Sequence, residues 1–318
     1  EGDPEINCTL TDAEGKEIGR AVSNGENIAI PVAAPVLWNA EQPYLYTLTL
    51  QAGAETIEQK VGIRTISVED GKILINGKQV KFRGVNRHDS NPYTGATVTR
   101  EDVIRDLQLM KESNVNAIRT SHYPNAPYFP ELCSEYGFYM IAEADLESHG
   151  VGTLYTNDGH DCMGYIAQDD AWAESILDRQ KRNVIRDKNQ SAVIFWSLGN
   201  ESGYGGNFED AGRWVKAYDP TRLLHYEASI YNSAGYHNDV SMLDVMSRMY
   251  ADTEWVKEYC EDRRMRKPFI QCEFIHAMGN GPGDIHDYME LMYKYDKFCG
   301  GFVWEWCDHA TWEGKAAD

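Results

Sequence analysis

The chain has 318 residues, of which 42% are hydrophobic and 25% are charged, and this composition disfavours wholesale disorder, collagen-like repeats and a coiled coil. Its 30 basic and 50 acidic side chains give a net charge of −20, which argues against a nucleic acid or an anionic membrane as a partner. No apolar run reaches the roughly 18 to 20 residues of a membrane-spanning helix, and the acidic opening Glu1-Gly2-Asp3-Pro4 does not have the pattern of a signal peptide.

Residues 1–66 have the pattern of a small all-β domain. The stretches 44–50 and 56–61 alternate polar and apolar side chains with the period of two that is typical of a half-buried strand. Turn signals separate such stretches at Gly15, Asn24-Gly25 and Gly53. We therefore predict a small antiparallel β-sandwich here, which can lack its first strands.

From residue 67 onward, short apolar strands alternate with amphipathic helices. A hairpin at Asn76-Gly77 leads into the first strand, and Thr99 with Asp102 forms a capping box at the start of the first helix. The predicted strands are 80–85, 116–119, 138–142, 192–196, 223–226, 243–246, 269–272 and 301–304. The predicted helices are 100–113, 126–136, 170–187, 207–217, 253–264 and 284–297. Residues 67–318 are therefore expected to form a (β/α)8 TIM barrel.

This predicted barrel departs from the ideal pattern in two places. No clear helix separates the fifth strand from the sixth. Only fourteen residues follow Trp304, and they are too few and too polar for an eighth helix. We expect the chain to be an excerpt of a longer protein that ends just after its last barrel strand.

The seven cysteines are scattered and form no Cys-x-x-Cys pair. This spacing is typical of reduced thiols rather than of a disulfide framework or a structural zinc site. We therefore expect a reducing compartment, the cytoplasm.

Two glutamates follow apolar strand segments at the predicted barrel mouth, where barrel enzymes carry their reactive groups. Glu201 follows the apolar run that ends the fourth strand, and Glu273 follows the seventh. Glycoside cleavage needs such a pair, because one carboxylic acid protonates the leaving oxygen while a second carboxylate attacks or activates water. Either glutamate alone fits a solvated acid equally well, but the pair favours catalysis. Other polar groups at strand ends include Asn86, Arg87, Arg119 and Glu143.

Aromatic side chains near the same strand ends favour a sugar ligand, because the C–H faces of a pyranose pack on rings. Tyr250, Trp304 and Trp306 are placed for this role, and Trp304 is the best platform. Trp196 lies inside a predicted strand and fits ordinary core packing better.

Glu147 and His149 lie on one side of an extended segment, and Glu201 can join them if their strands are neighbours. Carboxylate oxygens with a single imidazole suit Mg²⁺ better than Zn²⁺. A hydrogen-bonded loop pair of Glu147 and His149 explains the same spacing, so the residues alone leave both alternatives open.

Five segments of the chain closely resemble the β-galactosidases of glycoside hydrolase family 2, within a match that runs in order from about Leu37 to Asp308. They are FRGVNRH at 82–88, IRTSHYPN at 118–125, WSLGNESG at 196–203, CEFIHAMGN at 272–280 and GGFVW at 300–304. The resemblance implies an immunoglobulin-like β-sandwich followed by a catalytic TIM barrel. It also implies retaining hydrolysis of terminal β-D-galactosides such as lactose.

The resemblance also implies roles for individual residues. Glu201 matches the family's acid/base and Glu273 its nucleophile, whereas Glu147, His149 and Glu201 match its catalytic Mg²⁺ ligands. Residues that match groups which grip the galactosyl ring or support the carboxylates are His88, His122, Asn200, Tyr250, His276 and Trp304.

Two alternatives stand beside the β-galactosidase interpretation. The β-glucuronidases and β-mannosidases of the family share the two acids, although segments 121–123 and 276–280 look more like the galactosidase branch. The chain can also be an inactive sugar-binding fragment that needs its missing domains. Those domains normally supply a Na⁺ site and much of the tetramer contact, so we expect the full-length protein to be a homo-oligomer.

Overall fold

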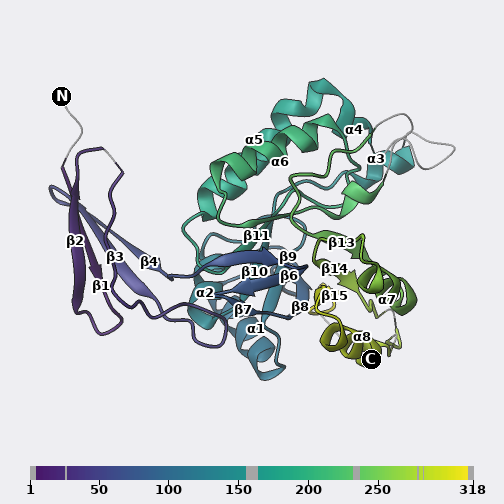
Figure 1. Cartoon of the computed structure of the whole chain (residues 1–318), viewed down its shortest axis with the longest axis horizontal. Coiled ribbons are helices and arrows are strands. Elements are labelled where there is room, and N and C mark those ends of the chain that lie inside the picture. Colours follow the sequence, from purple (N-terminus) through teal and green to yellow (C-terminus); the bar gives the residue numbers. More distant parts are fainter. Residues whose placement is uncertain are drawn as a thin grey trace.

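The computed structural model describes residues 5–25, 27–154, 164–231, 237–277, 279–281 and 283–313. Its N-terminal part is a single antiparallel sheet in the order β2-β1-β3-β4, which stands beside the rest of the molecule in Figure 1. The strands are β1 (Ile6–Thr11), β2 (Glu17–Ser23), β3 (Tyr46–Ala52) and β4 (Glu55–Val61). The prediction of an all-β N-terminal region is confirmed, and the described residues form one sheet of it.

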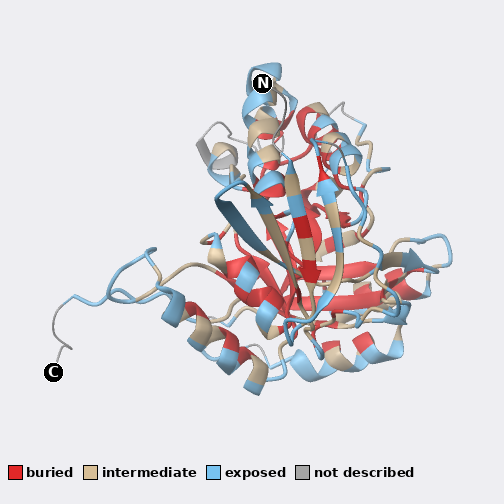
Figure 2. Ribbon diagram, turned by 90° about the vertical axis from the view of Figure 1, so that its left-hand side faces the viewer, coloured by how far each residue is buried: buried red, intermediate tan, exposed pale blue. Residues whose placement is uncertain are grey.

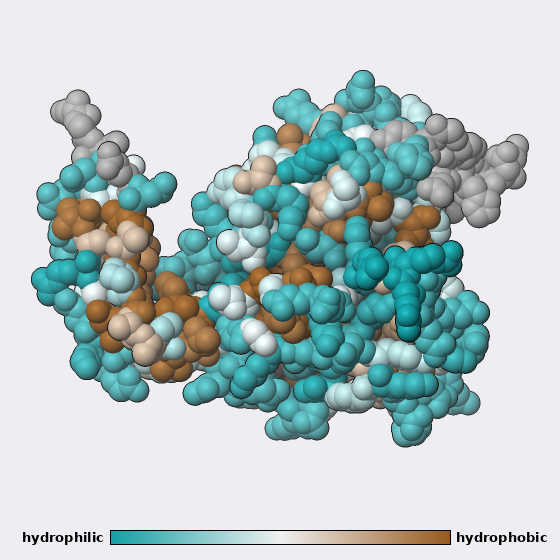
Figure 3. Space-filling view, in the orientation of Figure 1, coloured by the Kyte–Doolittle hydropathy of each residue, from teal (hydrophilic) through white to brown (hydrophobic). Residues whose placement is uncertain are grey.

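One face of this sheet carries a hollow of about 460 Å³. Figure 3 shows apolar residues gathered on this part of the surface. Its lining is mostly apolar and comprises Ile6, Cys8, Leu10, Ser23, Ile28, Ile30, Val32, Leu48, Leu50, Val61 and Ile63. A second sheet would pack on such a face in a sandwich.

Buried polar contacts fasten the N-terminal sheet to the barrel. The indole of Trp38 is fully buried and donates to the Ser134 carbonyl at 2.9 Å. The Arg64 guanidinium donates to the carbonyl oxygens of Ser191 and Val193, both at 2.6 Å. Because a lost partner would leave a buried donor unsatisfied, these contacts hold the two parts together.

A three-stranded sheet of β5 (Ile66–Glu69), β6 (Lys72–Ile75) and β7 (Lys78–Gln79) leads into the barrel, with the predicted hairpin at Asn76-Gly77. The barrel strands are β8 (Phe82–Arg87), β9 (Ala117–Thr120), β10 (Tyr139–Glu143), β11 (Val193–Ser197), β12 (Leu223–His225), β13 (Met246–Met249), β14 (Phe269–Phe274) and β15 (Phe298–Val303). They form a parallel sheet in the order β12-β11-β10-β9-β8-β15-β14-β13, which confirms the barrel prediction.

Helices cover the outside of the barrel in Figure 1. They are α1 (Arg100–Glu112), α2 (Tyr128–Tyr136), α3 (His149–Leu154), α4 (Tyr165–Gln168), α5 (Ala173–Asp187), α6 (Gly206–Tyr218), α7 (Thr253–Glu261) and α8 (Ile285–Lys294), with short 3₁₀ turns η1 (Asp170–Trp172) and η2 (Glu227–Ile230). The capping box of Thr99 and Asp102 is present at α1. As predicted, only η2 separates β12 from β13 in the described residues, and no helix follows β15 up to residue 313.

The sixth barrel strand begins three residues later than the sequence predicts, at Met246 rather than residue 243. Leu243 and Val245, whose apolar character suggested a strand, are buried beside β12. The Asp244 amide there donates to the Leu224 carbonyl at 3.0 Å. Burial, rather than a regular ladder, explains the apolar pattern of this segment.

Figure 2 shows that burial is concentrated in the barrel strands. Trp196 is fully buried and its indole donates to Asp219 at 2.9 Å, so the interpretation of Trp196 as a core residue is confirmed. The cysteines of the described ranges are free thiols, whereas Cys162 lies outside them. In the part of the chain that the structure describes, no helix is long and apolar enough to cross a membrane.

Candidate active site

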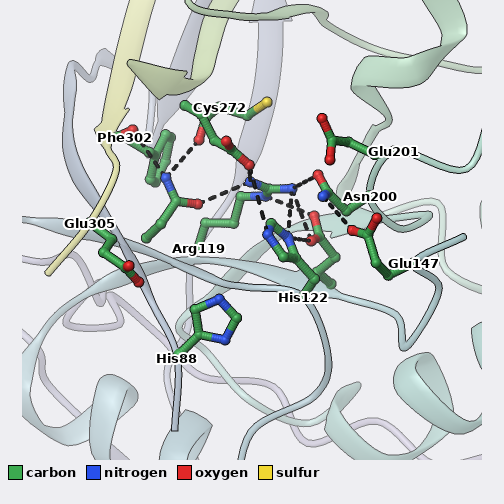
Figure 4. A network of polar contacts seen from close by, with 12 residues as sticks. His88, Arg119, His122, Glu147, Asn200, Glu201, Cys272, Phe302 and Glu305 are labelled. Carbon is green, nitrogen blue, oxygen red and sulfur yellow. Dashed lines mark hydrogen bonds and ion pairs between the residues drawn. The ribbon is translucent and has the colours of Figure 1, made fainter. Parts of the chain in front are cut away.

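The carboxyl ends of the barrel strands hold one connected cluster of polar side chains, centred on Arg119 of β9 (Figure 4). The guanidinium is fully buried and grips Glu143 of β10 with two hydrogen bonds of 2.7 and 2.9 Å. It also donates to Asn86 of β8 at 3.0 Å. A buried cation needs such partners because its transfer from water is costly.

The Glu143 carboxylate supplies the negative charge that balances the buried Arg119 guanidinium. Burial alone would raise its pKa, but the Arg119 guanidinium and the imidazole of His122 lower the pKa of Glu143 to about 2. The His122 Nδ1 atom lies 2.9 Å from a Glu143 oxygen. Glu143 therefore stays ionised across the whole neutral range and holds both neighbours in place.

Glu273 of β14 accepts hydrogen bonds at both of its oxygens. Arg119 donates to Oε1 at 2.8 Å, and the Tyr250 hydroxyl donates to Oε2 at 3.1 Å. The Glu273 side chain is only 8% exposed. Tyr250 follows β13 directly and has a positive φ of 52°, a conformation that concentrates at functional sites. Two donors, one in β9 and one just after β13, thus fix the orientation of the Glu273 carboxylate.

Glu147, His149 and Glu201 form a second cluster at the same end of the barrel. One ligand atom from each of them lies within 4.8 Å of the others. The His149 Nδ1 atom is 2.6 Å from Glu201 Oε2, and burial raises the pKa of Glu147. The segments that follow β10 and β11 are joined here by backbone contacts. Asn200 forms a β-bridge with Glu147, and the backbone amide of Asn200 donates to the Leu146 carbonyl at 2.8 Å.

The donor set of this second cluster fits a hard divalent cation, since it offers carboxylate oxygens and one imidazole. The backbone amide of His149 also donates to Glu147 at 3.3 Å, so the loop-pair contact that the sequence left open is present as well. The three-residue ligand cluster and the contact between Glu147 and His149 are therefore both present in the structure.

Asn200 connects the two clusters. Its Oδ1 accepts from Arg119 at 2.8 Å, and its Nδ2 donates to Glu147 at 2.5 Å (Figure 4). Glu201 follows Asn200 immediately and has a positive φ of 33°. The tight turn after β11 therefore places an amide and a carboxylate side by side at the barrel mouth.

Aromatic and imidazole rings form one wall of the site. The rings of His122 and Trp304 are stacked at 5.1 Å with an interplanar angle of 9°, and His88 lies edge-on to both. The His276 ring nitrogen lies 3.2 Å from the Trp304 carbonyl. Burial, assisted by the neighbouring His122, lowers the pKa of His88 to about 4, so this ring is neutral at pH 7.

The residues to which the family resemblance assigns a role are therefore joined by contacts at one end of the barrel, whereas the indole of Trp306 donates to Asp106 of α1 at 3.0 Å. Arg119, Glu143 and Asn86 received no role from the sequence, although they link the others. A signal for Arg119 existed, because a charged side chain inside the apolar strand β9 must be paired when it is buried.

The arrangement can perform acid and base chemistry with two carboxylates in different surroundings. Glu273 is almost fully buried between two donors, whereas the Glu201 side chain is 34% exposed and contacts an imidazole. Environments that differ in this way are typical of carboxylates with separate catalytic roles.

Comparison with known families gives two matches in this chain. The model described as glycosyl hydrolases family 2, TIM barrel domain, matches residues 66–317, and the model described as glycosyl hydrolases family 2 matches residues 3–64. Together they cover both the N-terminal sheet and the barrel.

Curated relatives of high similarity are longer than this chain. It is 50% identical over 300 residues to a beta-galactosidase of Actinobacillus pleuropneumoniae, covering 88% of this chain and 30% of that protein. It is 44% identical over 310 residues to a beta-galactosidase of Staphylococcus xylosus, covering 97% of this chain and 31% of that protein. The chain thus spans about 30% of the length of these relatives.

Solved structures with the same fold include a beta-D-glucuronidase of Dictyoglomus thermophilum, with a TM-score of 0.79 and 24% identity. A glucuronidase of Ruminococcus gnavus in its apo form has a TM-score of 0.79 and 22% identity. Each match covers 98% of this chain and 59% of the other. At this level of identity the similarity establishes the fold alone.

Proposed function

Because the chain belongs to glycosyl hydrolase family 2, we propose that the whole protein is a retaining β-galactosidase. Its substrates would be terminal β-D-galactosides such as lactose. Relatives that are 40 to 50% identical carry the name beta-galactosidase, which supports the galactoside over other sugars. The glucuronidase structures, at 22 to 24% identity, support only the alternative.

The observation that carries the proposal is the grip of Arg119 and Tyr250 on the two oxygens of Glu273. A carboxylate held in this way presents a defined oxygen to the anomeric carbon, and positioning of this kind lowers the barrier to attack. Glu273 is therefore the nucleophile of the proposed reaction, and the product of its attack is a galactosyl-enzyme ester.

Glu201 is the proposed acid and base. In the first step its protonated carboxyl group donates a proton to the glycosidic oxygen, and the aglycone leaves. In the second step the Glu201 carboxylate removes a proton from water, which attacks the anomeric carbon and releases galactose with its configuration retained. A double displacement of this kind requires the carboxyl groups of Glu201 and Glu273 to lie about 5 to 5.5 Å apart.

The galactosyl ring is proposed to bind against the wall of rings. The stacked His122 and Trp304 pair offers an apolar surface to its C–H faces. His88, His276 and Asn200 supply polar atoms for its hydroxyl groups or for support of the carboxylates. We place the sugar between this wall and the two glutamates.

We propose that Glu147, His149 and Glu201 hold one Mg²⁺ ion, since their donor atoms cluster within 4.8 Å. When bound, the ion would supply positive charge beside the acid/base carboxyl group. Glu147 and His149 keep Glu201 in place on the mouth of the barrel. A Na⁺ site and homo-oligomer contacts are proposed for parts of the protein beyond this chain.

The ligand assignment predicts that Glu147→Gln weakens Mg²⁺ binding at least about tenfold, because an amide replaces a charged oxygen donor. Isothermal titration calorimetry of the metal-stripped, full-length protein with Mg²⁺ measures this. Asp145→Asn, which neutralises an exposed carboxylate in the same loop, is the matched control and should bind as the wild type does. Equal affinities of wild type and Glu147→Gln would refute the site.

The substrate proposal is tested by the turnover of chromogenic β-galactosides, β-glucuronides and β-mannosides by the full-length protein. We expect the galactoside to have the largest kcat/KM. A preference for either other sugar would overturn the galactosidase assignment but leave the two carboxylates in their roles. Absence of turnover with all three would favour the second alternative, a sugar-binding protein without catalysis.

A further inference from the structure

The barrel has a seam between β12 and β13. Every other pair of neighbouring barrel strands is joined by a parallel ladder, whereas no ladder joins these two in the described residues. The Asp244 backbone amide donates to the Leu224 carbonyl at 3.0 Å, and the Asp244 carboxylate accepts from the Leu224 amide at 2.6 Å. Because β12 ends at His225, it offers no strand residues nearer the mouth that could form a ladder with β13. The contacts across that part of the seam must therefore come from side chains.

His225 bridges the seam inside the barrel. Its imidazole is fully buried, with Nε2 at 2.8 Å from the Ser247 hydroxyl of β13 and Nδ1 at 2.9 Å from the Ser197 hydroxyl of β11. Burial, together with the charge of Arg119, lowers the pKa of His225 to about 3. The neutral ring has one donor and one acceptor, which two serine hydroxyls can satisfy.

The chain of hydrogen bonds from His225 continues to the nucleophile. The Ser197 hydroxyl donates to Glu143 Oε2 at 2.8 Å. Glu143 is the carboxylate that Arg119 grips, and Arg119 donates to Oε1 of Glu273. His225 is therefore linked to one oxygen of Glu273 by consecutive polar contacts.

Glu227 bridges the seam at the mouth. Its side chain is buried, and its Oε1 accepts from the backbone amide of Met249 on β13 at 3.3 Å. Its Oε2 is buried without a partner in the described part of the chain. Met249 immediately precedes Tyr250, whose hydroxyl donates to Oε2 of Glu273. Glu227 therefore holds the backbone that aims Tyr250.

We propose that His225 and Glu227 close this seam with their side chains and thereby position Glu273. His225 supports Oε1 through Arg119, and Glu227 supports Oε2 through Tyr250. Both are positioning residues, since neither contacts the reacting atoms. This inference rests on the proposed function, in which Glu273 is the nucleophile.

The protonation of Glu227 gives a second measurement, the dependence of stability on pH, which does not require enzymatic activity. Burial raises the pKa of Glu227 to about 7, the Glu201 carboxylate adds to this, and a backbone amide with the cations Arg248 and Arg119 opposes it. The phenol of Tyr231 interacts with the same carboxyl group. Because the pKa is raised on folding, the contribution to stability is full below about pH 4.5 and is lost as the pH rises through about 7.

The test is a double-mutant cycle on the full-length protein with a chromogenic galactoside. We expect Glu227→Ala to lower kcat about tenfold while KM changes less than about threefold, because Tyr250 loses its support. In a Tyr250→Phe background the same change should cost less than about twofold, since the contact that it supports is already gone. Glu254→Gln, an exposed carboxylate on α7, is the control and should match wild type.

Two further variants keep the inference falsifiable if Glu227→Ala does not fold. Glu227→Gln retains the oxygen that accepts from Met249, so we expect kcat within about twofold of wild type and a flatter dependence of the thermal midpoint on pH between 5 and 7. His225→Leu leaves two buried hydroxyls without their bridge, and we expect a lower kcat with little change in KM.

Equal losses of kcat from Glu227→Ala in both backgrounds would overturn the inference while the proposed function stood. Unchanged kcat in Glu227→Ala and His225→Leu would do the same. An inactive wild-type protein would overturn the proposed function instead, so the two failures are distinguishable.

Discussion

Glu273→Gln in the full-length protein should reduce the turnover of β-galactosides by about 10⁴-fold or more, because the reaction loses its nucleophile. The amide is nearly isosteric, and its oxygen can accept from Arg119 while its NH2 group donates to the Tyr250 hydroxyl, so the fold is expected to persist. Steady-state kinetics with a circular dichroism spectrum of each variant measure both points. Glu254→Gln is the matched control, and turnover near the wild-type rate in Glu273→Gln would refute the assignment.

Chemical rescue separates the two carboxylates. In Glu273→Ala the cavity left by the side chain admits azide, which would attack the anomeric carbon directly and give the α-galactosyl azide. In Glu201→Ala the galactosyl-enzyme ester still forms from a substrate with a good leaving group, and azide would then displace Glu273 to give the β-galactosyl azide. The opposite pair of products would show that the roles are exchanged.

Arg119→Met should produce the largest loss of stability, about 3 to 5 kcal/mol, because it leaves the buried carboxylates of Glu143 and Glu273 without their cation. The urea-unfolding midpoint of the full-length protein measures this loss. Arg182→Met removes an arginine that is 78% exposed and paired with Asp178, and it should change stability by less than about 1 kcal/mol.

The direction in which the stability loss of Arg119→Met changes with pH tests whether the buried charge of Glu143 causes that loss. In the wild type the pKa of Glu143 is about 2, so its contribution to stability is present above about pH 4.5 and lost as the pH falls through 2. Without Arg119, burial would raise the pKa of Glu143 above its ordinary value. The deficit of Arg119→Met should therefore be larger at pH 8 than at pH 5, and a deficit that is the same at both would contradict this explanation.

The loss of Arg119 should also lower kcat, since the guanidinium orients Glu273, Asn200 and Glu143 together. Arg119→Lys keeps the charge but loses the bidentate geometry, because an ammonium group cannot match both oxygens of a carboxylate at once. We expect Arg119→Lys to recover more stability than activity.

The order of strands and helices could be predicted from local patterns, because the apolar strands of a parallel barrel are buried on both faces and stand out from polar loops. The capping box at Thr99 and the hairpin at Asn76-Gly77 are likewise local, and both are present. The start of β13 was misplaced, because Leu243 and Val245 are buried without belonging to a regular strand.

The linear sequence was enough to predict that Glu201 and Glu273 lie at the same end of the barrel, since parallel barrel strands all end at one face. The grip of Arg119 on Glu273, across 154 positions of chain, and the bridges of His225 and Glu227 emerge only in the folded molecule. Such contacts depend on how far neighbouring strands are shifted and how fully their side chains are buried. These quantities are set by the packing of the whole barrel, and they also decide the pKa values on which the chemistry depends.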